Sequence, residues 1–169
     1  MKIYIQDNPD HKEVRELFER AFNEILEDET GYFTPELDQN TLNAWFDYDE
    51  MIKYFKYGKL VEARDEENKL IGAGFIAKQH PISWPDGKKA ELFIIGVLPG
   101  TQRGGLGSMI LQKCEEAARD FGASTVIVNA HSMQPQLHTF YQKNGYKLIG
   151  ELSGYYENGN AKFFTKSLS

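Results

Sequence analysis

The sequence predicts an α/β (α+β) fold in which one mixed sheet of about six to seven strands carries helices on both faces. Apolar runs of strand length alternate with segments whose apolar residues recur at helical spacing. Glycine, proline and asparagine separate most of these segments. The length of 169 residues suits one domain, 1–169, and a composition of 41% hydrophobic residues is enough for a sizeable core.

The first third of the chain is predicted to be helical. Asp10 and Glu13 resemble a capping box, and helical spacing of apolar residues follows over 14–25. Thr34 and Pro35 predict a second helix start, and Gly58 a helix end. Tyr, Phe and Trp are dense over this stretch. They predict either part of an acceptor pocket or core, and core is favoured for any single ring.

The remaining elements follow from apolar runs and turn residues. Gly72 and Gly74 in the second strand would either weaken that strand or allow another backbone to approach it closely. Gly122 predicts the end of the long helix, and Asn158-Gly159 predicts the turn of a hairpin. The predicted order is strands 60–64, 70–79 and 91–98, helix 106–121, strand 124–129, loop 130–134, a helix from Pro135 to Asn144, and hairpin strands 146–153 and 161–167.

A glycine-rich loop joins the central strand to the long helix. Gln102-Arg103-Gly104-Gly105-Leu106-Gly107 lies between them. The first amides of a helix have no partner inside it and lie at the positive end of its dipole, so they bind phosphate groups. The loop lacks the Gly-Lys-Ser/Thr of a P-loop and the spacing of a dinucleotide fingerprint.

Two segments together resemble a known family. Val97-Leu98-Pro99 followed by residues 102–107 is similar to the acyl-CoA-binding motif of the GCN5-related N-acetyltransferase (GNAT) family. Residues 140–146, Phe-Tyr-Gln-Lys-Asn-Gly-Tyr, look like that family's Tyr-x-x-x-Gly-Phe/Tyr segment. The resemblance covers roughly 60–147 and fades in the first third of the chain.

The resemblance implies a GNAT-like fold and acetyl-CoA as co-substrate. It implies that the strands ending at Leu98 and Asn129 run parallel and splay apart, so that the pantetheine arm enters the split. The amides from Arg103 to Ser108 would hold the diphosphate, and Arg103 would add charge. The expected cofactor-binding residues are Ile95, Gly96, Val97, Gln102, Arg103, Gly104, Gly105, Leu106, Gly107 and Ser108.

Two residues are candidates for the acyl-transfer chemistry. Tyr141 matches the family's tyrosine that protonates the coenzyme A sulfur, and a phenol is a proton donor at neutral pH. Its alternative role is a core tyrosine. Glu91 resembles the glutamate that acts as general base in histone-modifying members, and burial would raise its pKa toward a useful range. A solvent-facing glutamate at the strand end is an equal alternative.

Three other residues are weaker candidates. Cys114 lies on the apolar face of the long helix with no histidine beside it in sequence, which favours an inert core cysteine over a nucleophile. Gln134 stands where many family members have asparagine, so one pantetheine or substrate contact is in doubt. His131 is expected to be a solvated loop histidine rather than a base. No residue set has the spacing of a metal site.

The expected activity is transfer of an acetyl group from acetyl-CoA to a primary amine by direct attack. A catalytically idle acyl-CoA-binding regulatory module, another acyl donor, an alcohol acceptor and a binding domain without coenzyme are the alternatives. The acceptor is a small molecule or peptide of unspecified identity, and a homodimer is compatible with the resemblance. A lone cysteine, the absence of a signal or spanning segment and a net charge of -6 indicate a cytoplasmic protein without nucleic-acid or membrane partners.

Overall fold

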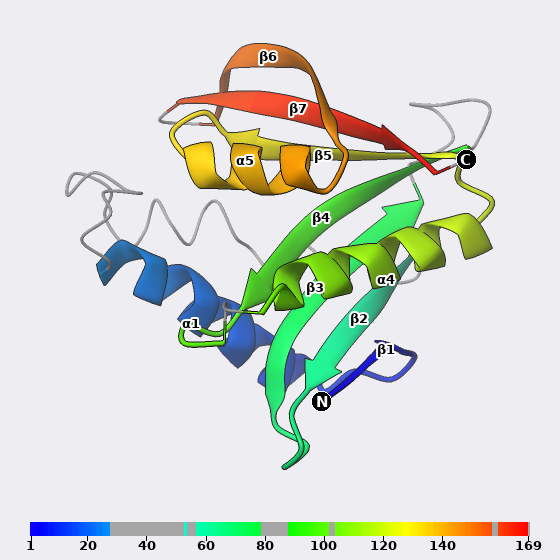
Figure 1. The fold of residues 1–169 in the computed structure, drawn as a ribbon, viewed down its shortest axis with the longest axis vertical. Coiled ribbons are helices and arrows are strands. Elements are labelled where there is room, and N and C mark those ends of the chain that lie inside the picture. Colours follow the sequence, from blue (N-terminus) through cyan, green and yellow to red (C-terminus); the bar gives the residue numbers. More distant parts are fainter. Residues whose placement is uncertain (28–52, 54–56, 79–87, 102–103, 157–158, 169) are drawn as a thin grey trace.

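The computed structural model describes residues 1–27, 53, 57–78, 88–101, 104–156 and 159–168, of which 23–27 are described by their backbone alone. The described residues form one mixed sheet of order β1-β2-β3-β4-β5-β7-β6, which confirms the predicted fold class (Figure 1). The strands are β1 (Lys2–Gln6), β2 (Gly58–Arg64), β3 (Leu70–Lys78), β4 (Lys89–Val97), β5 (Thr125–His131), β6 (Lys147–Tyr156) and β7 (Gly159–Ser167). The described helices are α1 (His11–Glu27), α4 (Leu106–Asp120) and α5 (Pro135–Lys143).

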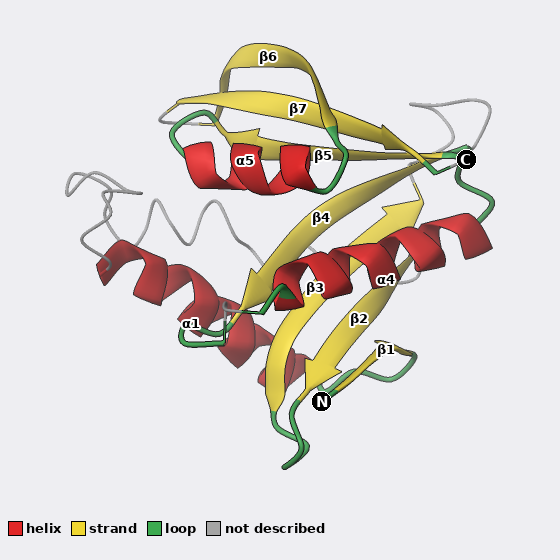
Figure 2. Cartoon of the chain, viewed as in Figure 1, coloured by secondary structure: helices red, strands yellow, loops and turns green. Residues whose placement is uncertain are grey.

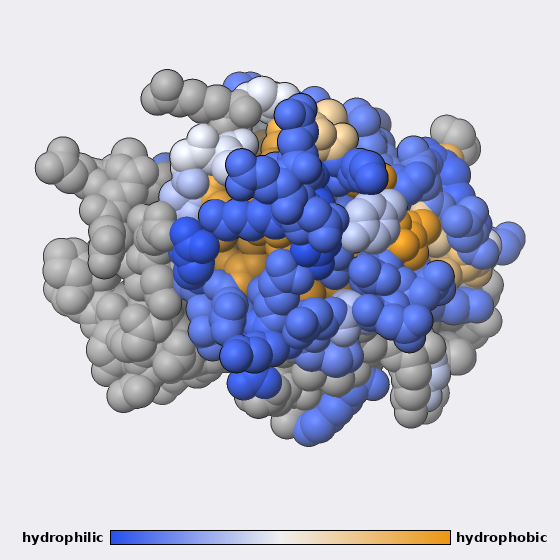
Figure 3. Space-filling model, turned by 90° about the horizontal axis from the view of Figure 1, so that it is seen from below, coloured by the Kyte–Doolittle hydropathy of each residue, from blue (hydrophilic) through white to orange (hydrophobic). Residues whose placement is uncertain are grey.

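Helices cover both faces of the sheet. On one face, α4 and α5 bury a cluster that includes Ile110, Leu111, Val126 and Phe164. On the other face, α1 packs Phe18 and its neighbours against β3 and β4. Apolar burial of this kind contributes about 25 cal/mol per Å². Seen from below in Figure 3, the described surface is mainly hydrophilic, with hydrophobic residues showing between the hydrophilic ones.

Helix α1 begins as predicted, but only one half of the capping box forms. The Asp10 carboxylate accepts hydrogen bonds from the backbone N–H groups of Lys12 (3.0 Å) and Glu13 (3.2 Å). The Glu13 carboxylate accepts from the Arg64 guanidinium at 3.0 and 2.6 Å instead of from the cap. The ion pair between Glu13 and Arg64 therefore takes the place of the second hydrogen bond of a capping box, in which Glu13 would accept from the backbone N–H of Asp10.

Strand β1 is absent from the predicted order, in which nothing precedes the first helix. Lys2–Gln6 pairs antiparallel with β2, from Lys2 opposite Arg64 to Gln6 opposite Leu60. Ile3 and Ile5 alternate with polar residues and pack against the α4-side core. The alternation is a strand signal, but its partner lies more than fifty residues along the chain.

At Gly72 and Gly74, where α4 crosses β3, the nearest approach is by side chains of α4 and not by another backbone. A Cβ at Gly72 would lie 2.7 Å from Ile110 Cδ1, and one at Gly74 would lie 2.9 Å from Cys114 Sγ. Both distances are too short for any larger residue. The two glycines therefore set how closely the glycine-loop helix lies against the sheet.

Two predicted strand ends differ from the structure, and other predicted elements lie outside the residues that the structure describes. Strand β5 continues to His131, so Ala130 and His131 do not begin a loop. Strand β6 is longer than predicted and ends at Tyr156. The helices expected from Thr34 to Phe55 and most of the loop around Trp84 lie outside the described residues. Among the helices that are described, none is long and apolar enough to cross a membrane.

Candidate active site

The two parallel strands at the centre of the sheet separate along their length. Strands β4 and β5 pair only from Lys89 opposite Thr125 to Glu91 opposite Ile127. Beyond Glu91, β4 stays paired with β3 and diverges from β5, as Figure 2 shows. The split that the resemblance implied is therefore present.

The strand residues expected to meet pantetheine lie along this split. Ile95, Gly96 and Val97 pair with β3 on one side, opposite Gly74, Ala73 and Gly72. On the other side, no described strand pairs with them. Their outward backbone groups therefore form a strand edge that an extended ligand with amide groups can pair with.

The start of α4 has the geometry of an anion site. Gly104 and Gly105 have φ of 104° and 79°, and no atom lies within 4 Å of a Cβ built on either. Backbone conformation, not space, therefore requires glycine there. The Met109 N–H donates to Gly105 O at 3.0 Å, so the amides of residues 106–108 precede the helical bonding and remain for a ligand. Gln102 and Arg103 lie outside the described residues.

The helix start meets the split at Gly107. A Cβ at Gly107 would lie 3.4 Å from the Phe140 ring of α5 and 3.9 Å from Val97 Cγ2 of β4. The end of β4 and the start of α4 therefore meet the middle of α5, which follows about thirty residues later in the chain. The predicted phosphate site and the predicted strand edge form one continuous surface.

Tyr141 is held on α5 by aromatic packing, 3% exposed. Its ring centroid lies 5.3 Å from Phe140, 5.7 Å from Tyr146 and 5.8 Å from Phe164. Burial, with smaller contributions from Tyr156 and Cys114, raises the pKa of the Tyr141 phenol well above its ordinary value. Among the described residues, none hydrogen-bonds its hydroxyl. Tyr141 therefore keeps its proton and can donate it to a ligand.

Glu91 lies at the root of the split, on the last pair that β4 makes with β5. It is half-buried rather than at the exposed end of the strand, because β4 begins two residues earlier at Lys89. Burial is the main cause that raises the pKa of Tyr155 and of Tyr156, and the negative charge of Glu91 raises both pKa values further. Glu91 is therefore in electrostatic reach of the phenols at the end of β6.

Three residues beside the split were missed or misplaced by sequence reasoning. The Tyr156 hydroxyl donates a hydrogen bond to Asn129 Oδ1, and the Tyr156 ring lies 5.0 Å from that of His131. The expectation that His131 is a solvated loop residue is wrong, since it lies in β5 and is 3% exposed. The sequence pattern that could have predicted this is the alternation along β5. Asn129 and His131 occupy the positions that alternate with the buried valines, so they lie on the opposite face of the strand.

The other weak candidates take structural positions. Cys114 is fully buried, and burial together with the charge of Glu115 raises the pKa of its thiol, so a thiolate nucleophile is disfavoured there. Gln134 precedes the first turn of α5 and is 8% exposed. Among the described residues, no group of three or more His, Cys, Asp or Glu side chains could hold a metal ion.

Comparison with known proteins agrees with this geometry. The model of the acetyltransferase (GNAT) family matches residues 12–146. The uncharacterized N-acetyltransferase YjcF of Bacillus subtilis (strain 168) is 42% identical over 57 residues, a match that spans 34% of this chain and 39% of that relative.

Solved structures show the same fold at low sequence identity. An aminoglycoside 6'-N-acetyltransferase complexed with coenzyme A is 16% identical with a TM-score of 0.72, covering 100% of this chain and 98% of its own. A GNAT family acetyltransferase from Elizabethkingia anophelis with acetyl-CoA bound is 13% identical with a TM-score of 0.68, covering 98% and 97%. With the family match over most of its length, this chain belongs to the GNAT acetyltransferase family.

Proposed function

We propose that the chain is a single-domain N-acetyltransferase that transfers an acetyl group from acetyl-CoA to a primary amine in a ternary complex. The observation that carries the proposal is the position of Tyr141. Its protonated phenol lies on the helix whose Phe140 meets the glycine-loop helix, next to the split between β4 and β5. A proton donor beside an anion site and an open strand edge suits a thioester that must release a thiolate.

The donor would bind along the surface that joins these elements. Amides of residues 104–108 hold the diphosphate, and Gln102 and Arg103 contribute as the motif implies. The outward edge of Ile95, Gly96 and Val97 pairs with the pantetheine amides. The acetyl-bearing sulfur then lies in the split, within reach of Tyr141. The coenzyme-bound relatives support this assignment through their shared fold.

The reaction needs one base and one acid. Glu91, directly or through a water molecule, takes a proton from the acceptor ammonium. The neutral nitrogen attacks the thioester carbonyl carbon, forming a C–N bond and a tetrahedral oxyanion. Collapse breaks the C–S bond, and the leaving thiolate takes the proton of Tyr141. The products are the acetylated amine and coenzyme A, and no covalent enzyme intermediate is needed.

Donor binding is tested by a thermal-shift titration with acetyl-CoA, with ATP as the control nucleotide. At a hundredfold excess over Kd, a ligand of the folded state adds about 2.7 kcal/mol, and a chain of this size gains roughly 2–4 °C per kcal/mol. We expect a rise of several degrees with acetyl-CoA and little with ATP. No shift with acetyl-CoA would reduce the glycine loop to a structural turn.

A pair of glycine variants isolates the role of the loop. Gly104 and Gly122 both have positive φ and open space around a Cβ, but Gly122 lies at the far end of α4. Alanine at either position should cost about 1–2 kcal/mol of stability through backbone strain. Only Gly104→Ala should weaken acetyl-CoA binding, by about tenfold or more, as measured by calorimetric titration. Equal affinities of the two variants would contradict the assignment.

Substitution of the proposed base gives a kinetic test. Glu91→Gln should lower kcat about a hundredfold or more and remove the acidic limb of the pH–rate profile, because the amide accepts no proton. Glu67→Gln, in the exposed turn between β2 and β3, is the control and should leave both unchanged. A Glu91→Gln profile that matches the wild type would place the base elsewhere.

Turnover separates the enzyme from an idle coenzyme-binding module. Release of the coenzyme A thiol is followed with an amine panel of spermidine, tyramine, a short peptide and lysine. Thiol release that depends on an amine supports the transferase. Acetyl-CoA binding without release in any of these assays would favour the regulatory module instead.

A further inference from the structure

The side chains of one sheet face continue past the point where β4 leaves β5. Glu91 lies opposite Ile127, and paired residues project to the same face of a sheet. Asn129 and His131 follow at alternate positions of β5, so they project to that face beyond the last β4–β5 pair. They are therefore on the Glu91 side of the open split.

The hairpin of β6 and β7 brings an aromatic side chain to this place. Asn129 pairs with Phe163 of β7, and Tyr156 pairs with Gly159. The end of β6 therefore returns to the carboxyl end of β5. From there the Tyr156 hydroxyl donates a hydrogen bond to Asn129 Oδ1.

The Tyr156 ring is fixed on two sides. It lies 5.0 Å from the His131 ring at an interplanar angle of 32° and meets Tyr155 edge-on at 5.1 Å. His131 is itself held, because the Met133 N–H donates to its Nδ1 at 3.1 Å. A Cβ at Gly159 would lie 2.5 Å from His131 Nε2, so the hairpin backbone closes tightly on that ring. The phenol oxygen therefore has a defined position.

The orientation of the hydroxyl decides what it offers a ligand. A phenol has one O–H to donate and lone pairs that accept. Since the O–H of Tyr156 is used in the hydrogen bond to Asn129, the lone pairs of Tyr156 Oη are what it presents to a ligand, and Oη acts as a hydrogen-bond acceptor. Burial raises the pKa of Tyr156, with Tyr155 and Glu91 adding to the effect, so the phenol stays neutral. Tyr156 also contributes to the raised pKa of Tyr141, which places it near the proposed acid.

We infer that Tyr156, oriented by Asn129, accepts a hydrogen bond from the acceptor amine and holds its nitrogen for attack on the thioester. The inference rests on the proposed function and adds a substrate-positioning residue to it. A primary amine that has given one proton to Glu91 still has N–H groups for Tyr156 and a lone pair for the carbonyl carbon. An alcohol has a single O–H, which the base takes. The arrangement therefore selects primary amines over alcohols.

The test compares four variants with the amine of the panel that the wild type uses best. Tyr156→Phe keeps the ring contacts and removes only the hydroxyl. We expect its KM for the amine to rise about tenfold, the size of one lost hydrogen bond, with the KM for acetyl-CoA within about twofold of wild type. Tyr155→Phe is the matched control, an adjacent phenol of the same strand, and should behave as wild type.

Asn129→Ala tests the orienting contact. It should raise the amine KM in the same direction but less, because the hydroxyl can then turn. The double variant should be no worse than Tyr156→Phe alone, since Asn129 acts through that hydroxyl. Melting temperatures without ligand check that each variant folds.

The outcomes separate the inference from the proposed function. If Tyr156→Phe has the amine KM of Tyr155→Phe while the wild type acetylates amines, the inference is wrong and the transferase stands. Additive effects of the two substitutions would also overturn it. If the wild type neither binds acetyl-CoA nor releases thiol with any amine of the panel, the proposed function fails and the inference fails with it.

Discussion

Replacing Tyr141 with phenylalanine is expected to lower kcat by about a hundredfold or more, within the range for loss of a general acid. The substitution removes only the hydroxyl, and the ring contacts with Phe140, Tyr146 and Phe164 remain. Because no described residue hydrogen-bonds that hydroxyl, folding should lose little. Affinity for acetyl-CoA should be unchanged. The measurements are steady-state kinetics and calorimetric titration with acetyl-CoA.

Tyr146→Phe is the matched control for this result. Tyr146 is also buried and its ring lies 5.7 Å from that of Tyr141, but burial and the charge of Glu115 dominate the rise in its pKa. It should leave kcat near the wild-type value. An unchanged kcat in Tyr141→Phe would remove Tyr141 from the mechanism, and equal losses in both variants would indicate general disturbance of the aromatic cluster.

The pH dependence of the wild type follows from the direction of the same shift. The pKa of Tyr141 is raised by burial, so the acid form persists to a higher pH than for a free phenol. Loss of Tyr141 as a donor should therefore not limit activity at pH values below about 10, the ordinary pKa of tyrosine. An alkaline limb that begins near neutrality and disappears in Tyr141→Phe would contradict this.

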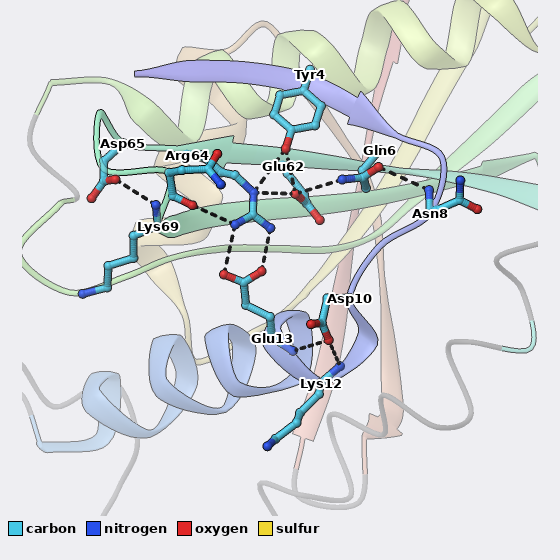
Figure 4. A network of polar contacts seen from close by, with 11 residues as sticks. Tyr4, Gln6, Asn8, Asp10, Lys12, Glu13, Glu62, Arg64, Asp65 and Lys69 are labelled. Carbon is cyan, nitrogen blue, oxygen red and sulfur yellow. Dashed lines mark hydrogen bonds and ion pairs between the residues drawn. The ribbon is translucent and has the colours of Figure 1, made fainter.

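Replacing Arg64 with alanine is expected to cost about 3–5 kcal/mol of folding free energy, because it leaves a buried carboxylate without its charged partner. Glu62 is fully buried, and its Oε2 accepts from Arg64 Nε at 2.9 Å and the Tyr4 hydroxyl at 3.2 Å. The same guanidinium pairs with both oxygens of Glu13 on α1 (Figure 4). Arg64 therefore joins β1, β2 and α1.

The melting temperature should fall by roughly 10 °C, at about 2–4 °C per kcal/mol for this chain length. The hydrogen bond with Glu13 contributes most to raising the pKa of Arg64. The raised pKa means that this stabilisation is present below the unfolded pKa of arginine and is lost only at extreme alkalinity. The loss caused by Arg64→Ala should therefore be similar across neutral pH.

Two further variants make the stability result specific. Lys12→Ala removes an exposed ion pair in which Lys12 Nζ lies 3.9 Å from Glu16 Oε1. This substitution should change the free energy of unfolding by less than about 1 kcal/mol. Adding Glu62→Leu to Arg64→Ala should recover part of the loss, since the buried carboxylate of this site is then absent as well. A cost of Arg64→Ala no greater than that of Lys12→Ala would show that Glu62 finds adequate solvation without it.

The glycine loop and the elements on either side of it can be predicted from the sequence. Strand, positive-φ glycines and helix are consecutive, so composition and spacing alone predict the strand before residue 98, the turn at Gly104 and Gly105 and the apolar face of α4. The motif around Tyr141 is equally local. These features depend on neighbours a few residues apart, whose conformational preferences a short stretch of chain already contains.

The partners of Glu91, Tyr156 and Arg64 depend on how distant strands and helices pack together. Tyr156 and Asn129 are 27 residues apart, and Arg64 and Glu13 are 51 apart. Their contacts depend on the register of strand pairs and on which sheet face each helix covers, and a shift of one residue would turn every side chain to the other face. The family motif, the glycine loop and most elements can be recognised from the sequence, because each depends on residues that are close together in the chain. Strand β1, the extension of β5 to His131 and the grouping of phenols beside Glu91 arose only when distant strands paired, because pairing energy is non-local.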